Sequence, residues 1–484
     1  MPLYSLSFLC LFLPIGLILY YLVPKQGRNA ALLGIGLCYY LLNDPFNLPL
    51  MIISLGTDYI FYRLFCRYAG FPEVQRAFLT GALLKNAGFL LLAFGFSIFG
   101  DQRLPLGIFI YTFSSVDLFL GLWRREVRTL LSPVDFFLWH TLFFRLYAGP
   151  FVPPSEFVKQ ISQRVPDASK MLEGIYLFLQ GLAIKLLLVD QLYSLYGELT
   201  PVPTFQLSFF GAWLTLLTGL FYLLFSLESW CRMARGIGAM FGFSLPRNIF
   251  YPLLADSIGR FLGRFNSSVT ALFRRRFSQP LCRRFDGMFC QYLITVGCCV
   301  MLGVWFSADY PHVLWGVLMG TLLFLERRVS PARLNRIPPF FRRCFTGTVV
   351  VLSFTLLIVH TLPDCGGLLY SLFFGNNILL NICPCFWECC SPQGGCSGCT
   401  PCAHAGFPEL RRGFPLPFIW GWGDYALPIC SRQYLCTKPI FAAAKGGGHC
   451  AEKAGFPDVL FHLSAASHCL CGACGDSPRT CKTL

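Results

Sequence analysis

The sequence predicts an all-α, polytopic membrane protein, and three observations carry that prediction. Hydrophobic residues make up 55% of the 484 residues, and charged residues make up only 13%, whereas a soluble domain carries about 25% charged residues. Apolar runs recur through the first three-quarters of the chain, and several approach the ~20 residues that a helix needs to cross a bilayer. Because lipid offers backbone groups no hydrogen-bond partner, such runs are expected to be helices.

The apolar runs define the predicted helices in chain order. The first run lacks the basic start and the small-residue cleavage site of a signal peptide, so we expect an uncleaved first helix. Shorter runs are expected to be re-entrant or buried between other helices, and roughly ten or more membrane-embedded segments are expected in all. The clearest runs are Phe8–Val23, Leu48–Leu64, Phe89–Phe99, Ile108–Leu122, Ile175–Leu188, Leu207–Leu227, Met288–Phe306, Val313–Leu325 and Thr346–Leu362.

Two connections between the runs differ in composition. Gly149–Ser169 is polar and rich in proline, and we expect a turn at Pro153–Pro154. Pro246–Ala271 is less apolar than its neighbours and carries scattered arginines. Irregular backbone at membrane depth is tolerated only where protein or water covers it, so this second connection is predicted to be irregular or re-entrant inside the bundle.

The net charge of +15 is concentrated in connections between apolar runs. Basic residues gather in cytoplasmic loops of membrane proteins, so these connections are predicted to face the cytoplasm. Since this rule accounts for the basic residues, we expect membrane lipid as a partner and no nucleic acid. The basic groups are Arg124, Arg125 and Arg128; Arg274–Arg276, Arg283 and Arg284; and Arg327, Arg328, Arg333, Arg336, Arg342 and Arg343.

The composition divides the chain into a membrane body, residues 1–380, and a tail, residues 383–484. The tail holds fourteen of the 24 cysteines and loses the apolar periodicity. Three interpretations stay open: a metal or iron–sulfur module built on Cys396, Cys399 and Cys402, a disulfide-rich extracytoplasmic tail, or a tail without a selected fold. The abrupt loss of periodicity favours the third interpretation, in which a shifted reading frame replaces the usual C-terminus.

Five segments in order resemble the membrane-bound O-acyltransferase family, in the bacterial branch that includes alginate O-acetyltransferase. The resemblance runs from about residue 8 to residue 330. The most informative segment reads GVWFSADYPHVLWGVLMG and is similar to the family pattern LWHG…FVLWGLYHG. The five segments are Leu11–Pro24, Leu104–Arg124, Phe143–Phe157, Phe241–Pro252 and Gly303–Gly320.

The resemblance implies a multi-helix bundle with re-entrant segments around a central cavity, in the bacterial cytoplasmic membrane. It implies transfer of an acyl group, in this branch acetyl, from acetyl-CoA or an acyl carrier to hydroxyls of a cell-envelope polysaccharide. The donor is a substrate, not a bound cofactor, and an extracytoplasmic acetyltransferase partner is expected. A buried histidine in the family activates the hydroxyl, because an alcohol attacks well only when a base accepts its proton.

This sequence departs from the family at the histidines. The LWHG histidine aligns with Phe306, the LYHG histidine with Met319, and a third common histidine, in FWRRWHISLS, with Asn266. Loss of a positioned general base typically costs about 10²–10⁴-fold in rate, and phenylalanine at position 306 is not competent for that role. The flanking residues of the motif are retained and are expected to line the cavity with Met319 and Asn266: Trp305, Trp315, Gly316 and Gly320.

Two other histidines are candidate substitutes. His312 follows Phe306 by six residues, and a turn entering a helix would point it into the same cavity; the alternative is that it lines a helix beside Pro311. His140 lies in the apolar run before the AGP segment. A lone histidine there is typical of a satisfied core group, although ionisable residues inside a membrane often mark function.

Four charged residues complete the candidate site. Asp309 and Glu228 are expected to line the cavity, and the alternative for Glu228 is a pair with Arg232 four residues along. Arg260 and Arg264 share one helix face and are candidate ligands for an anionic donor; the alternative is anchoring at lipid headgroups. Tyr111 and Ser114 are expected to serve packing and interhelical hydrogen bonds.

Two functions therefore stay open from sequence. The first is a membrane O-acyltransferase that acetylates an envelope polymer. The second is a catalytically inactive relative, acting as a membrane scaffold or arising as a decayed gene product. The chain contains no GxSxG, GxxxxGK[ST] or HExxH pattern, so no other catalytic class and no metal site in the membrane body are predicted.

Overall fold

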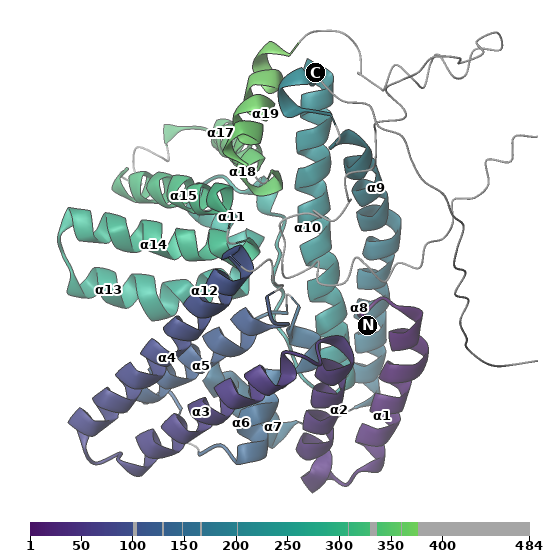
Figure 1. Ribbon diagram of the computed structural model, residues 1–484, viewed down its shortest axis with the longest axis vertical. Coiled ribbons are helices and arrows are strands. Elements are labelled where there is room, and N and C mark those ends of the chain that lie inside the picture. Colours follow the sequence, from purple (N-terminus) through teal and green to yellow (C-terminus); the bar gives the residue numbers. More distant parts are fainter. Residues whose placement is uncertain are drawn as a thin grey trace, which may run out of the picture. The chain divides into compact units, whose positions relative to one another are not determined.

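The computed structural model describes residues 1–99, 104–127, 130–147, 149–164, 167–200, 202–307, 309–329, 336–359 and 361–375. Every regular element within these ranges is a helix, which confirms the all-α prediction (Figure 1). These residues all belong to one structural unit, Met1–Ala426. The tail at 383–484, with its clustered cysteines, lies outside the described residues, so its boundary and its three interpretations stay predictions.

The described helices follow one another with short connections. Three of them contain a five-residue π-helical turn, at η1 (Phe8–Phe12), η4 (Lys185–Val189) and η7 (Arg274–Ser278). The α-helices are α1 Leu13–Leu22, α2 Arg28–Asn43, α3 Leu48–Arg67, α4 Pro72–Phe99, α5 Ile108–Trp123, α6 Pro133–Thr141, α7 Pro154–Gln163, α8 Ala168–Ile184, α9 Asp190–Leu199, α10 Phe209–Met240, α11 Ile258–Phe265, α12 Ser267–Phe273, α13 Gln279–Arg284, α14 Met288–Phe306, α15 Tyr310–Arg328, α17 Pro339–Ser353, α18 Thr355–Ile358 and α19 Leu362–Phe374.

The protein is a multi-pass membrane protein. Six described segments are long and apolar enough to cross a bilayer, and two shorter apolar helices, Phe8–Leu22 and Ile108–Trp123, accompany them. The larger number of membrane-embedded segments expected from the sequence stays a prediction. The six segments are Leu48–Arg67, Pro72–Gly95, Ala168–Leu199, Phe209–Met240, Met288–Phe306 and Pro339–Ile358.

The apolar runs locate most of these helices but not all of their lengths. The run Met288–Phe306 coincides with α14, whereas the run Phe89–Phe99 is only the second half of α4. The connection expected to turn at Pro153–Pro154 instead contains helix α7, which begins at Pro154. Proline fits the first turn of a helix because that position needs no intrahelical N–H donor.

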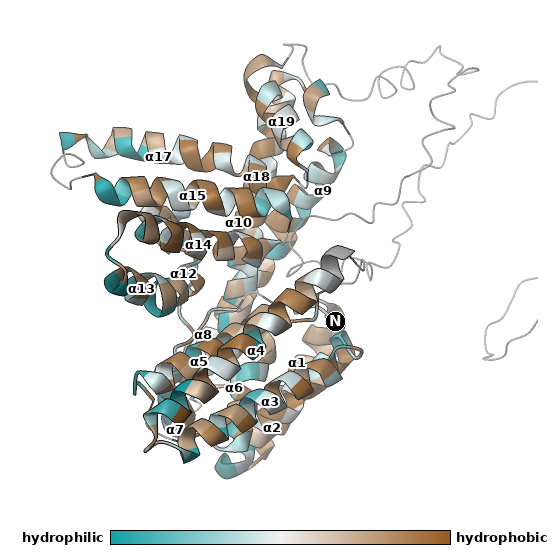
Figure 2. Cartoon of the chain, turned by 60° about the vertical axis from the view of Figure 1, so that its left-hand side comes forward, coloured by the Kyte–Doolittle hydropathy of each residue, from teal (hydrophilic) through white to brown (hydrophobic). Residues whose placement is uncertain are grey.

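Helix α10 is the central helix of the described body, and α4 is peripheral. Two-thirds of the most apolar window of α10, 67%, is buried inside the protein, against 17% for α4. Figure 2 shows apolar residues along the outer surfaces of α4 and α14, and hydrophilic residues at the ends of α13, α15 and α17. Exposed Leu91, Leu92 and Phe289 belong to these apolar surfaces, as expected for helices that face lipid.

Glycines allow α8 to approach α10 closely. A Cβ atom on Gly236 would lie 2.6 Å from the carbonyl oxygen of Gly174, and one on Gly181 would lie 2.8 Å from the backbone nitrogen of Met233. Both distances are shorter than any real Cβ contact. Small residues at such crossings let the backbones touch, which is how helices associate where lipid provides no hydrophobic driving force.

A buried polar network joins α3, α4 and α5. The carboxylate of Asp58 is fully buried and lies 2.8 Å from the ammonium group of Lys85. It also accepts hydrogen bonds from Asn86 and Ser115. Because a charge inside a membrane protein is costly unless it is paired and hydrogen-bonded, this network fixes how the three helices meet.

The segment between α10 and α12 confirms part of the prediction for Pro246–Ala271. Residues 243–250 carry no helix, and the short helices α11 and α12 follow. The irregular backbone is satisfied by protein groups: Asn248 accepts from the backbone N–H groups of Ser267 and Ser268, through its own carbonyl and side-chain oxygens respectively. Polar backbone inside the bundle thus finds partners, which is what lipid would not supply.

Candidate functional site

The segment Gly303–Gly320 forms the tightly packed hairpin of α14 and α15. A Cβ atom on Gly316 would lie 2.4 Å from the Cα atom of Val300, and one on Gly320 would lie 2.6 Å from that of Val296. A Cβ atom on Gly303 would lie 2.2 Å from the carbonyl oxygen of His312. The glycines of the motif are therefore explained by backbone contact between the two helices.

Phe306 lies at the end of α14 and is 1% exposed. Its ring centroid is 5.4 Å from that of Phe265 and 6.4 Å from that of Trp315, the latter edge to face. Phe265 in turn contacts Phe261 and Phe354. We call these five residues the Phe306 cluster. Aromatic rings fill the position that the resemblance aligns with the family histidine, and aromatic pairs of this geometry stabilise the packing.

Trp305 contacts a second set of rings. Its centroid lies 5.3 Å from Phe109 and 6.0 Å from Phe113 of α5, and 5.5 Å from Phe151. Trp315 donates from Nε1 to the hydroxyl of Ser353, at 3.3 Å. The two tryptophans of the motif therefore connect the α14–α15 hairpin to α5 and to α17.

His312 is completely buried in the first turns of α15. Trp315 and Met319 follow it by three and seven residues and are also completely buried, so the three side chains share one helix face. At 1.5 Å per residue, His312 and Met319 are about 10 Å apart along that face. The chain thus carries an imidazole two turns away from the aligned position of the second family histidine.

Asn266 lies between α11 and α12, directly after Phe265 of the Phe306 cluster. It is 3% exposed, and its side-chain oxygen has no hydrogen-bond donor among the described residues. Its backbone carbonyl accepts from Thr270 in the first turn of α12. The structure therefore brings the aligned positions 306 and 266 to neighbouring, buried places through the contact of Phe265 with Phe306.

The two carboxylates predicted to line a cavity are both engaged. Asp309 precedes α15, and its side chain accepts from the hydroxyl of Ser307 at 2.9 Å. Glu228 on α10 accepts from Arg232 at 2.5 Å, and Arg247 lies 3.9 Å away. The alternative interpretation of Glu228, a pair along its own helix, is therefore present in the structure.

Arg260 and Arg264 lie on the short helix α11, as the spacing predicts. The Arg260 side chain is 63% exposed and pairs with Asp256, which also lies 3.7 Å from Arg342. Arg264 is half-buried. The Arg260 guanidinium already pairs with the carboxylate of Asp256. Arg260 and Arg264 together therefore offer an incoming anion less positive charge than the sequence suggests.

His140 is a fully buried core residue of α6. Its Nδ1 lies 2.7 Å from the carbonyl oxygen of Phe136, and its ring contacts Phe136 and Trp139. Burial lowers the pKa of His140 to about 3, so the ring is neutral at physiological pH. The contact of Nδ1 with the Phe136 carbonyl and the two ring contacts fit a packing role for His140.

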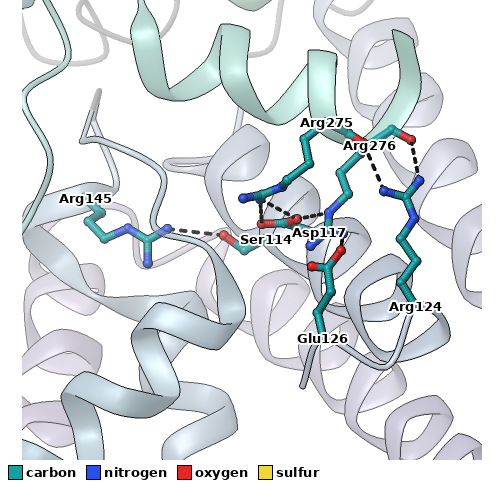
Figure 3. Close-up of polar contacts among 7 residues, drawn as sticks. All are labelled: Ser114, Asp117, Arg124, Glu126, Arg145, Arg275 and Arg276. Atoms are coloured by element: carbon teal, nitrogen blue, oxygen red, sulfur yellow. Dashed lines mark hydrogen bonds and ion pairs between the residues drawn. The ribbon is translucent and has the colours of Figure 1, made fainter. Parts of the chain in front are cut away.

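Sequence inspection missed one group of charged side chains, shown in Figure 3. Asp117 of α5 contacts both Arg275 and Arg276 of η7, and Arg276 also contacts Glu126. Asp117 is a lone carboxylate within an apolar run, and a buried charge of that kind requires a partner. The lone carboxylate was therefore a signal in the sequence that a partner exists. The sequence did not identify that partner, because Arg275 and Arg276 lie about 160 residues further along the chain.

Comparison with curated proteins finds relatives over most of the chain. A probable alginate O-acetylase of Pseudomonas fluorescens is 26% identical over 378 residues, which cover 76% of this chain and 75% of the relative. That of Azotobacter vinelandii is 28% identical over 340 residues, covering 66% and 67%. A peptidoglycan O-acetyltransferase of Helicobacter pylori is 24% identical over 371 residues, covering 67% and 70%. No family model matches the chain.

Proposed function

Since the chain belongs to the alginate O-acetylase-like branch of the membrane-bound O-acyltransferases, we propose that it transfers an acetyl group to hydroxyls of a cell-envelope polysaccharide. Relatives named for acetylation of alginate and of peptidoglycan support this substrate class. The observation that carries the proposal is the α14–α15 hairpin, in which the motif glycines bring the two helices into contact and Trp305, Trp315 and His312 are all buried.

His312 is the proposed general base. It would accept the proton of an acceptor hydroxyl, whose oxygen then forms a bond to the carbonyl carbon of an acetyl thioester while the carbon–sulfur bond breaks. The thiolate leaves and takes up a proton, so the products are the acetyl ester and a free thiol. Acetyl-CoA or an acyl carrier protein would supply the thioester as a substrate.

The proposed location is the bacterial cytoplasmic membrane, with the basic helix ends toward the cytoplasm. The arrangement of basic residues supports this orientation: Arg67 ends α3, Arg124 follows α5, and Arg327 and Arg328 end α15. An acceptor polymer outside the cell would then require a path through the membrane body and an extracytoplasmic acetyltransferase partner that completes the transfer. Membrane lipid surrounds the apolar outer helices.

The proposal is tested with membranes from a host that lacks related acyltransferases. Transfer of labelled acetyl groups to alginate and to peptidoglycan fragments is measured for the unmodified chain, His312→Gln and His140→Gln. We expect the His312→Gln rate to fall about 10²–10⁴-fold and the His140→Gln rate to stay within a few-fold, with thermal unfolding confirming that both variants fold. Equal rates for the unmodified chain and His312→Gln would reject His312 as the base.

A second candidate function is a non-catalytic membrane component, and Phe306 favours it. Aromatic rings fill the position of the family histidine, and phenylalanine accepts no proton. The discriminating variant is Phe306→His in the same membranes. If the unmodified chain transfers no acetyl group and Phe306→His does, the chain is a non-catalytic relative of the family. Turnover by the unmodified chain excludes that function.

A further inference from the structure

Two basic segments that are far apart in sequence meet beside α5. Arg124 donates to the backbone carbonyl oxygens of Arg275 and Arg276, at 2.9 and 3.4 Å. Arg275 donates to both oxygens of Asp117 at 3.0 Å, and Arg276 contacts Asp117 and, at 2.8 Å, Glu126. We call these five residues the arginine cluster, and Figure 3 shows how they converge.

The arginine cluster retains positive charge and donors after its internal pairs are counted. Three guanidinium groups face two carboxylates, and Arg274 adds an exposed charge beside them. Arg275 Nε and Arg276 Nη2 are inaccessible to solvent and have no acceptor among the described residues. The Arg276 side chain is completely buried. Because unpaired buried donors are costly, their presence indicates that an acceptor belongs there.

The backbone around the arginine cluster is also unusual. Arg275 and Arg276 lie in η7, a π-helical turn, and such turns are frequent at functional sites. Arg125 has a φ of 58°, and its N–H and that of Glu126 bond back to the carbonyls of Leu122 and Gly121. This is the helix ending in which glycine is strongly preferred. Strain of this kind persists where surrounding structure requires it, as at ligand-binding segments.

The arginine cluster is open to solvent at one end and connected to the α14–α15 hairpin at the other. The Arg275 side chain is 35% exposed. Phe109 and Phe113, which contact Trp305, lie eight and four residues before Asp117 on α5, so the distance along the helix is about 12 Å at most. Between them, Arg145 donates to Ser114 and its guanidinium lies 5.9 Å from the Phe151 ring.

We propose that the arginine cluster is a phosphate-binding site that holds a phosphate-bearing ligand with its anionic group on Arg275 and Arg276. Guanidinium groups bind phosphate oxygens through charge-assisted, bidentate hydrogen bonds. Two sources carry this chemistry: the phosphate of an acyl donor and the headgroup of an anionic lipid. The first source rests on the proposed function. In that case the arginine cluster binds the donor phosphate, and Arg260 and Arg264, which the sequence suggested for this role, do not.

The test is a binding measurement on the full chain in phosphatidylcholine nanodiscs, without acceptor or acetyl group. The probes are labelled coenzyme A, with inorganic pyrophosphate as competitor, and phosphatidylglycerol supplied in the nanodisc. Arg275→Gln removes the partly exposed guanidinium and leaves Asp117 paired with Arg276. Arg283→Gln removes an exposed charge from the same basic connection, outside the cluster, and is the matched control.

We expect coenzyme A to bind the unmodified chain and Arg283→Gln with equal affinity, and to bind Arg275→Gln about tenfold more weakly. Pyrophosphate should displace the bound coenzyme A. This result would identify the acyl donor as the source of the phosphate. If the unmodified chain retains phosphatidylglycerol and Arg275→Gln retains less, the ligand is a lipid headgroup, and this result also supports the site. If neither coenzyme A nor phosphatidylglycerol binds, or if Arg275→Gln and Arg283→Gln lose the same affinity, the proposed phosphate-binding site is wrong. This binding measurement does not depend on acetyl transfer. A chain that binds coenzyme A but shows no acetyl transfer in the separate assay would contradict the proposed function and still support this site.

Discussion

The Phe306 cluster is buried and the arginine cluster is open to solvent at one end, and the two clusters handle polarity in opposite ways. At position 306, which the resemblance aligns with a family histidine, rings from α11, α14 and α15 fill the space. Around Asp117 the chain buries a carboxylate together with the guanidinium group of Arg276. An aromatic residue in place of histidine removes the proton-accepting nitrogen but can keep the packing. A buried ion pair, by contrast, cannot lose one partner without leaving an unpaired charge.

The largest effect is expected when the arginine cluster loses its central carboxylate. Asp117→Asn leaves Arg275 and Arg276 without their shared partner, and breaking a buried pair in this way costs about 3–5 kcal/mol. The free energy of unfolding in detergent measures the loss. Glu73→Gln is the control, because Glu73 pairs with Arg76 on an exposed surface and such pairs contribute little. Similar losses in both variants would contradict the assignment of Asp117 as a buried anchor.

A somewhat smaller effect is expected at the α14–α15 contact, which carries the Phe306 cluster. Gly316→Ala places a methyl group 2.4 Å from the Cα atom of Val300, and backbone atoms cannot rotate away. Overpacking of this kind costs about 3 kcal/mol. Gly297→Ala on the other helix of the hairpin, α14, meets no atom within 4 Å, so the stability of that variant should be unchanged or slightly higher. Thermal unfolding of the two variants gives the comparison, and equal melting temperatures would mean that the hairpin is not tightly packed.

The Phe306 cluster itself is expected to tolerate polarity poorly. Phe306→His places an imidazole among apolar rings, and burial of a polar group without a hydrogen-bond partner costs about 2 kcal/mol. Phe306→Leu keeps the site apolar and serves as the control for lost ring contacts. The free energies of unfolding of both variants decide the question. A Phe306→His protein more stable than Phe306→Leu would indicate that the cluster still contains a partner for imidazole.

The smallest effect is expected at the strained residue beside the arginine cluster. Arg125→Gly relieves a left-handed backbone that costs a side chain roughly 1–2 kcal/mol, so we expect a gain of about 1 kcal/mol in the free energy of unfolding. Arg125→Ala removes the same charge but keeps the Cβ atom. If the alanine variant gains as much as the glycine variant, charge and not backbone strain explains the difference.

The sequence was sufficient for the fold because its strongest signals are local. Runs such as Met288–Phe306 need only length and hydrophobicity to define a helix. The start of α4 at Pro72 and the helix α7 were missed, since their residues are mixed in polarity and their ends depend on proline at the first turn and on packing. The resemblance likewise rested on ordered motifs and not on any single residue, and the relatives that cover most of the chain bear it out.

The candidate site was predictable only in part. The resemblance placed Trp305, Trp315 and Met319 in the candidate site, and all three are buried. The arginine cluster did not, because Asp117 and Arg276 are far apart in sequence and only the fold brings them together. Glu228 and Arg260 differ, because their partners Arg232 and Asp256 lie only four residues away, and these ion pairs leave less charge for a ligand.

We propose that the α14–α15 hairpin retains catalytic function through His312 although position 306 is aromatic. The most direct measurement is the initial rate of labelled acetyl incorporation into alginate by vesicles that contain either the unmodified chain or Phe306→His, in equal folded amounts. We predict a measurable rate for the unmodified chain and no gain of tenfold or more for Phe306→His. No incorporation by the unmodified chain, together with incorporation by Phe306→His, would contradict the claim.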